Sequence, residues 1–180
     1  MDDLPELSTL GRRIMIVGPT NAGKSTLAVA IGEKLGIPAQ HVDLFRHAPR
    51  TDWVQRPDDE FEALHLAAIA EPEWVMDGNY SAIMPARLQR ATGIIALDDA
   101  LWRRYLRYFS RTLGERNAGA LEGNRDSIKW AMIQWLWRTR KSGPKLRAMA
   151  EGTGLPVAVC RNERELDRLY RAWGLTLPSA

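Results

Sequence analysis

The chain has 180 residues, 45% of them hydrophobic, and a formal net charge of +3. This length suits one domain spanning residues 1–180, and the apolar fraction suffices for a core, which argues against a disordered chain. No apolar run approaches the roughly 18 residues of a membrane span, and the first residues are acidic, unlike those of a signal peptide. We therefore expect a soluble, cytoplasmic protein with no membrane partner. Its single cysteine, Cys160, excludes an internal disulfide and a metal site built from cysteines.

The first predicted unit is a strand, a glycine-rich loop and a helix. Residues 14–17 form a short apolar run typical of a buried strand, and residues 25–35 have a helical pattern. The intervening residues 18–25 fit G-x-x-x-x-G-K-[ST] at every fixed position. Backbone N–H groups of such a loop hold phosphates, Lys24 would reach the β- and γ-phosphates, and Ser25 would join the shell of a Mg²⁺ ion. The predicted nucleotide-binding residues are Gly18, Thr20, Asn21, Ala22, Gly23, Lys24, Ser25 and Thr26.

Strands and helices alternate through the rest of the chain. Further strands are predicted at residues 39–43, 74–76, 92–97 and 156–160. Helices are predicted at residues 57–70, 81–90, 101–113, 126–141, 145–150 and 163–173, with loops at 44–56 and 114–123. Short apolar strands separated by helices predict a three-layer α/β fold, in which a five-stranded parallel sheet carries helices on both faces.

The carboxyl ends of the predicted strands carry polar side chains. Ligands of parallel sheets bind beyond these ends. Asp77 ends the third strand, where an acid of the Walker-B type would hold Mg²⁺ together with Ser25. Asp43 ends the second strand and could accept a proton from a substrate hydroxyl, hold a Mg²⁺-bound water, or only cap a turn or helix. We interpret Asp98 as a helix N-cap and expect Arg161, after the fifth strand, on the nucleotide side.

Residues 101–150, which we call the basic segment, carry 12 Lys and Arg against three acids. Such a segment could close over a polyphosphate, bind a nucleic acid, or form a solvated helical face. Arg103, Arg107 and Arg111 recur every four residues and share a helix face, with Arg104 one step around. An arginine aimed at a γ-phosphate offsets charge in the transition state, so Arg103 and Arg107 are the candidate catalytic arginines.

Other aromatic and basic residues have weaker patterns. Arg87 and Arg90 follow the turn after the third strand and could face an acceptor. We interpret the tryptophans at 130, 135 and 137 as core residues rather than as a base-stacking surface. The histidines at 41, 47 and 65 share no ligand spacing, so no zinc site is predicted.

Several stretches together resemble a known family. They are the glycine-rich loop at 18–25, which we call the P-loop, HVD at 41–43, EWVMDGNYS at 73–81, GIIALD at 93–98, LWRR at 101–104 and WLWRTRKSGPK at 135–145. These residues resemble the adenylate-kinase-related P-loop proteins often labelled DNA topology modulation proteins, over about residues 13–170. The resemblance implies a nucleoside-monophosphate-kinase-like fold with sheet order 2-3-1-4-5 and a helical lid formed by the basic segment. It also implies that Asp77 matches the third-strand acid of such kinases, and that the helix at 101–113 carries the lid arginines.

Two departures from adenylate kinases concern the acceptor. Those enzymes follow the third-strand Asp-Gly with an aromatic residue, a proline and an arginine, whereas Asn79, Tyr80 and Ser81 follow here. Residues 41–43 are closer to kinases that hold a metabolite hydroxyl with an aspartate. Both departures argue against adenosine monophosphate as the acceptor.

The sequence therefore predicts a phosphotransferase that uses ATP and Mg²⁺ on a small acceptor bearing a hydroxyl or a phosphate, or an ATPase if there is no acceptor. Its predicted catalytic residues are Lys24, Asp43, Asp77, Arg103 and Arg107. The alternative hypothesis is an ATP-gated regulatory protein whose basic segment binds nucleic acid. Either would act as a monomer or a homodimer.

Overall fold

A five-stranded parallel sheet runs through the computed structural model, which describes residues 4–51, 53–113 and 130–176. Neighbouring strands follow the order β2–β3–β1–β4–β5, and every pairing is parallel. The strands are β1 (Arg13–Val17), β2 (Ala39–His41), β3 (Trp74–Asp77), β4 (Gly93–Leu97) and β5 (Val157–Cys160). The predicted fold class and strand order are confirmed.

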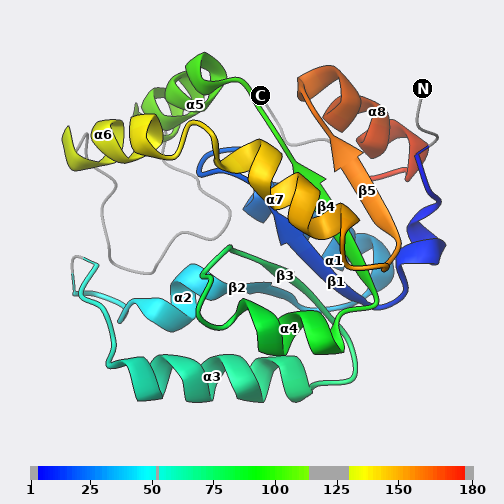
Figure 1. The fold of residues 1–180 in the computed structure, drawn as a ribbon, viewed down its shortest axis with the longest axis horizontal. Coiled ribbons are helices and arrows are strands. Elements are labelled where there is room, and N and C mark those ends of the chain that lie inside the picture. The colour runs from blue at the N-terminus through cyan, green and yellow to red at the C-terminus, as the bar shows by residue number, and fades with distance from the viewer. Residues whose placement is uncertain (1–3, 52, 114–129, 177–180) are drawn as a thin grey trace.

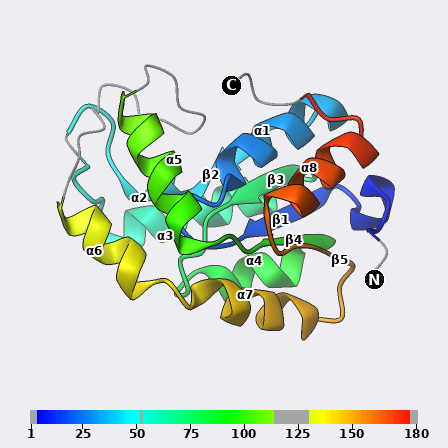
Figure 2. The ribbon, with the colours of Figure 1, turned by 90° about the horizontal axis from the view of Figure 1, so that it is seen from above.

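Helices cover both faces of this sheet and one of its ends. They are α1 (Lys24–Leu35), α2 (Val42–Arg46), α3 (Asp58–Ala70), α4 (Met84–Arg90), α5 (Leu101–Leu113), α6 (Trp130–Arg138), α7 (Ser142–Glu151) and α8 (Glu163–Ala172), with a short 3-10 helix, η1 (Leu7–Leu10), before β1. Figure 2 shows α1 and α8 on one side of the sheet and α4 and α7 on the other. Helices α5 and α6 lie beyond the carboxyl ends of the strands (Figure 1). No helix within the described ranges is both long and apolar enough to cross a membrane.

Successive residues of β1 supply two separate cores. Ile14 and Ile16 belong to a buried cluster with residues of α1 and α8, whereas Met15 and Val17 belong to a second cluster with residues of α3, α4 and α7. Successive side chains of a strand point to opposite faces of the sheet, and helices cover both faces here. Residues 14–17 are therefore all apolar. The buried thiol of Cys160 lies in the first cluster.

The predicted second strand is too long. Strand β2 ends at His41, and residues 42–46 form α2, so Asp43 lies in the first turn of a helix and not at the end of a strand. Val42 is completely buried and packs against Gly78, where a Cβ would lie 2.8 Å from the Cβ of Val42. This contact with the neighbouring turn redirects the chain, and an acid in a first helical turn is favoured by the helix dipole.

Two predictions around α6 and α7 are also wrong. The helix predicted at 145–150 begins earlier: α7 starts at Ser142 and includes Gly143 and Pro144. A proline fits in the first turn of a helix because the N–H groups there form no hydrogen bond within the helix. The three tryptophans interpreted as core are exposed, with Trp130 at 70%, Trp135 at 52% and Trp137 at 56%. Helix α6 packs against α5 beyond the end of the sheet, not on a covered face. The predicted loop 114–123, residues 126–129 of the predicted helix and the side chain of Arg111 lie outside the described residues.

Candidate functional site

The loop between β1 and α1 has the backbone that its sequence predicts. Gly18 has φ +156°, and a Cβ there would lie 2.6 Å from the carbonyl oxygen of Leu97, so only glycine fits. Gly23 has φ +89° and caps α1, while Asn21 adopts φ +63°. Lys24 Nζ donates to the carbonyl oxygen of Pro19 at 2.9 Å, which folds the lysine over the loop. Thr20 and Ala22 lie in this loop, and Ser25 and Thr26 lie in the first turn of α1.

Asp77 lies directly beside the P-loop serine. Ser25 Oγ donates to Asp77 Oδ2 at 2.5 Å, and His41 Nδ1 lies 2.8 Å from Asp77 Oδ1. Burial alone would raise the pKa of Asp77, but the bond and charge of His41, with help from Ser25 and Lys24, lower it below the ordinary value. Burial alone would lower the pKa of His41, yet Asp77 raises it. The two side chains therefore form a buried hydrogen-bonded pair across β2 and β3, in which each stabilises the charged form of the other. Sequence reasoning did not place His41 at the candidate site.

This donor set suits Mg²⁺. The described residues contain no group of three or more His, Cys, Asp or Glu that could hold a metal ion. Magnesium at phosphoryl-transfer sites instead takes oxygen ligands from one or two protein side chains and completes its shell with phosphates and water. The hydroxyl of Ser25 and the carboxylate of Asp77 provide two such oxygens beside the phosphate loop.

The turn after β3 connects the P-loop to the predicted acceptor side. Asn79 Nδ2 donates to the carbonyl oxygen of Gly18 at 2.8 Å, and Asn79 Oδ1 accepts from the N–H of Gly18 at 3.2 Å. Tyr80 Oη donates to Asp43 Oδ1 at 2.6 Å, and its ring packs edge-on against Phe61. Burial and then the charge of Asp43 raise the pKa of Tyr80, so the phenol keeps its proton and orients the carboxylate. The DGNY stretch thus contacts both predicted subsites.

Two arginines of α5, Arg104 and Arg107, contact the P-loop. Arg103 forms an ion pair with Glu163, and Arg107 pairs with Asp99 at 2.5 Å while Nη1 donates to the carbonyl oxygen of Asn21 at 3.3 Å. The most buried of them is Arg104, which sequence reasoning left out of the catalytic set and which is only 1% exposed. It donates from Nε to the carbonyl oxygen of Thr20 at 2.8 Å and from its terminal nitrogens to Thr139. The basic segment therefore contacts the loop that would hold phosphates.

Arg161 is exposed and follows β5 at the same edge of the sheet. A small cavity lies next to it, between the P-loop, the ends of β4 and β5, and the start of α8, with Ala22 and Asn162 in its lining. Asp98, interpreted as an N-cap, lines this cavity, lies against Gly143 and faces Arg147 at 3.7 Å. Asp98 and the P-loop residue Ala22 thus line one cavity, and Arg161 lies in the chain between two further lining residues, Cys160 and Asn162.

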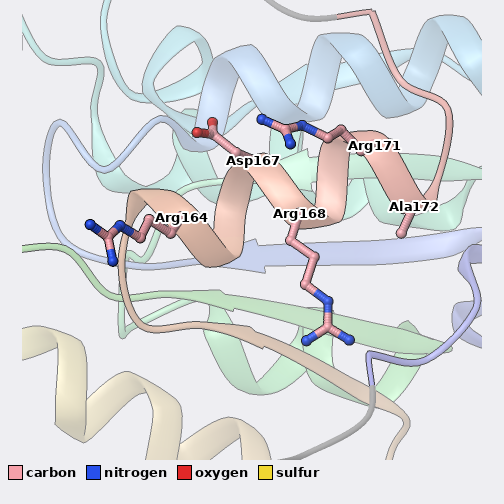
Figure 3. A pocket seen from close by; sticks show the side chains of 5 residues that line it. All are labelled: Arg164, Asp167, Arg168, Arg171 and Ala172. Atoms are coloured by element: carbon pink, nitrogen blue, oxygen red, sulfur yellow. The ribbon is translucent and has the colours of Figure 1, made fainter.

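A larger hollow on the surface of α8 does not have the features of a site. Its lining comes from one helix only, namely Arg164, Asp167, Arg168, Arg171 and Ala172. Figure 3 shows that the guanidinium groups of Arg164, Arg168 and Arg171 point in different directions rather than toward one centre. We therefore place the candidate site at the P-loop.

Comparison with known proteins gives structural neighbours alone. No protein-family model matches the chain, and no curated protein matches its sequence. A gluconokinase from Sinorhizobium meliloti 1021 has a similar structure, with a TM-score of 0.54, 16% identity, and coverage of 92% of this chain and 91% of that one. The chain therefore shares its fold with that protein. A shikimate kinase from Bacteroides thetaiotaomicron gives a TM-score of 0.50 at 17% identity, covering 90% of this chain and 98% of its own.

Proposed function

We propose that this protein is a phosphotransferase that uses ATP and Mg²⁺ to phosphorylate a small acceptor bearing a hydroxyl or a phosphate. One observation carries the proposal: the hydroxyl of Ser25 meets the carboxylate of Asp77 at 2.5 Å beside the P-loop. A P-loop serine and a strand-end acid are the two protein ligands that hold Mg²⁺ in P-loop enzymes. The fold shared with a gluconokinase and a shikimate kinase supports the same class of activity.

Each predicted residue has a role in this proposal. The backbone of residues 18–26 and the side chain of Lys24 hold the phosphates, while Arg161 lies on the nucleotide side. Ser25 and Asp77 would hold Mg²⁺, which when bound neutralises charge on the β- and γ-phosphates. His41 acts as a positioning residue, because its bond to Oδ1 fixes the orientation of the Asp77 carboxylate.

Asp43 is the proposed base. Its carboxylate is exposed on α2 and is oriented by Tyr80 Oη at 2.6 Å, so its second oxygen can accept a proton from an acceptor hydroxyl. Arg103 and Arg107 are the proposed transition-state arginines, within a basic segment that forms the lid. In the free protein they pair with Glu163 and Asp99, so the γ-phosphate competes with these acids for the guanidinium groups.

The test is ATP consumption by the purified protein with Mg²⁺, alone and with pools of nucleoside monophosphates, nucleosides and small hydroxylated metabolites. We expect one pool to stimulate turnover, and Lys24→Ala and Asp43→Asn each to reduce the stimulated rate by about 100-fold or more. Asp59→Asn, on the exposed first turn of α3, is the matched control and retains the wild-type rate. Absence of stimulation by every pool would contradict the proposal.

A second candidate is the ATP-gated nucleic-acid-binding protein, which the exposed aromatic residues of α5 and α6 favour. The guanidinium of Arg103 lies 4.8 Å from the ring of Trp102, and that of Arg140 lies 4.6 Å from the ring of Trp137. Exposed tryptophans beside arginines are typical of surfaces that stack single-stranded bases. This function predicts binding to single-stranded DNA or RNA that falls steeply with salt and persists in Asp43→Asn.

A further inference from the structure

Arg87 is a buried cation with almost no partner. It lies on α4 and is 0% exposed, and among the described residues its one hydrogen bond runs from Nη2 to the carbonyl oxygen of Asn79 at 3.4 Å. Its Nε and Nη1 atoms have no acceptor in the described parts of the chain. Burial lowers the pKa of Arg87 to about 10, although the charge of Asp77 opposes this shift, so the side chain still carries its charge at neutral pH.

A second unpartnered group lies near Arg87. His65 of α3 is also 0% exposed, and neither Nδ1 nor Nε2 has a hydrogen-bond partner among the described residues. Burial, and then the positive charge of Arg87, lower the pKa of His65 to about 4. The ring is therefore neutral at pH 7 and offers one free N–H donor beside the free donors of Arg87.

Other enclosed arginines of this chain show how a structural arginine is held. Arg56 donates to the carbonyl oxygens of residues 44, 45 and 47 and pairs with Glu60. Arg104 donates to Thr20 and Thr139. A buried charge that lacks such partners destabilises the fold, which makes Arg87 an exception that its packing does not explain.

The position of Arg87 connects it to the acceptor side of the site. Its one acceptor, Asn79, holds Gly18 of the P-loop through two hydrogen bonds, and the next residue, Tyr80, donates to Asp43. The free donors of Arg87 thus lie under the turn that joins the phosphate loop to the proposed base. An anionic group is what a desolvated guanidinium binds most strongly.

We propose that Arg87, with His65 beside it, binds an anionic group of the acceptor, so that the substrate is a small hydroxylated compound bearing a carboxylate or a phosphate. This inference rests on the proposed phosphotransferase function. Because Arg87 has no exposed surface in the free protein, the Asn79–Tyr80 turn has to shift when the acceptor enters. This shift would break the 3.4 Å bond from Arg87 to Asn79.

The first test measures anion binding without turnover. Thermal unfolding is followed with Mg²⁺ and a saturating non-hydrolysable ATP analogue, so that the P-loop is occupied, and glycerol, glycerate or glycerol 3-phosphate is then added. Glycerate or glycerol 3-phosphate should raise the Tm of the wild type and not that of Arg87→Met. A shift with glycerate would identify the anionic group of the acceptor as a carboxylate, and a shift with glycerol 3-phosphate would identify it as a phosphate. Glycerol should raise neither.

The matched control is Arg90→Met, an exposed arginine of the same helix, which should keep the anion-induced shift. Arg90 was expected to face an acceptor, but it lies at the amino end of β1, where its carbonyl oxygen accepts from Arg13 and its Nη2 donates to the carbonyl oxygen of Ala70. Without ligand, Arg87→Met should unfold at the same temperature as the wild type or higher, because it removes an unpaired buried charge. A lower Tm for unliganded Arg87→Met together with a retained anion shift would make Arg87 a structural residue and overturn the inference.

The second test measures turnover with the same three compounds and with larger neutral, carboxylated and phosphorylated polyols. An anionic pool should stimulate ATP consumption, and Arg87→Met should raise the KM for that acceptor by roughly 10- to 100-fold, with Arg87→Lys recovering part of the loss. Equal stimulation of wild type and Arg87→Met by a neutral pool would overturn this inference and leave the phosphotransferase standing. An anion shift that needs Arg87, without stimulation by any pool, would overturn the phosphotransferase and leave the anion site standing.

Discussion

Asp77 and Arg87 are buried charges on successive elements, β3 and α4, and the protein surrounds them in opposite ways. Both oxygens of Asp77 are bonded, one to Ser25 and one to His41. Two nitrogens of Arg87 and both of His65 have no partner among the described residues. The group of Asp77, Ser25 and His41, which we call the complete side, therefore has a fully bonded carboxylate before any ligand binds. Arg87 and His65, which we call the incomplete side, hold polar atoms that the described parts of the chain do not satisfy. The free protein is thus pre-organised around Asp77 and not around Arg87.

The largest expected effect comes from removing the acid on the complete side. Asp77→Ala leaves His41 without its counter-ion and Ser25 without its acceptor, so we expect the free energy of unfolding to fall by about 3–5 kcal/mol. Urea denaturation at pH 7 measures this change. Asp59→Ala, an exposed acid of α3, is the control and should change stability far less. A loss below about 1 kcal/mol for Asp77→Ala would mean that the two sides do not differ as described.

His65→Leu tests the incomplete side through its pH dependence. The pKa of His65 is about 4 in the folded protein and near 6.5 in the unfolded chain, so the unfolded chain binds more protons between these values. His65 therefore makes the folded protein progressively less stable as pH falls from 6.5 toward 4. We expect the free energy of unfolding of His65→Leu to exceed that of the wild type by about 1–3 kcal/mol at pH 7. This difference should grow by about 3 kcal/mol between pH 7 and pH 4. Parallel stability curves from urea denaturation across this pH range would contradict the assignment.

Asn79 lies between the two sides. Asn79→Ala removes both side-chain bonds to Gly18 and keeps the backbone oxygen that Arg87 uses, so we expect a loss of about 1–2 kcal/mol in stability. It should also weaken ATP binding, measured by titration calorimetry, because the P-loop glycine loses its support. Asn79→Asp keeps an acceptor for the N–H of Gly18, so its stability should lie between that of the wild type and that of Asn79→Ala. Unchanged ATP affinity in Asn79→Ala would show that the turn does not support the P-loop.

Tyr80→Phe should have the smallest effect. It removes one hydrogen bond, to Asp43 at 2.6 Å, and keeps the ring against Phe61, so stability should fall by about 0.5–1.5 kcal/mol. The more sensitive measurement is the kcat of acceptor-stimulated ATP consumption, because Asp43 loses the donor that orients its carboxylate. We expect kcat to fall by roughly 3- to 10-fold. A kcat identical to that of the wild type would exclude Tyr80 as an orienting partner of the base.

The features that the sequence predicted well are local. The apolar runs that form β1, β4 and β5, the glycines of the P-loop and the acid at the end of β3 each depend on a few contiguous residues. A strand with helices on both sides must be apolar at every position, and Gly18 must lack a Cβ because the chain passes so close to Leu97. Such constraints act on single short segments and are visible there.

The features that the sequence missed depend on distant partners. The pattern AQHVD does not reveal that Val42 packs against Gly78 and turns the chain into α2, or that His41 pairs with Asp77. The spacing of arginines on α5 predicted Arg103 and Arg107 as the phosphate-facing pair, yet Arg104 lies deepest against the P-loop. The tryptophans of α6 were interpreted as core residues because tryptophan is usually well buried. The sequence does not show that α6 packs beyond the end of the sheet, where these side chains are exposed.

The alternation of strands and helices, the phosphate loop and the acid that ends β3 all follow from the amino-acid sequence, because apolar periodicity and glycine geometry act within a few residues. Which charges are satisfied depends on the packing of distant segments. His41 comes from β2, Ser25 from α1 and Asp77 from β3, and the parallel sheet brings them within hydrogen-bonding distance. The same packing buries Arg87 and His65 without partners among the described residues, because burial and pairing are properties of the packed chain rather than of any single segment.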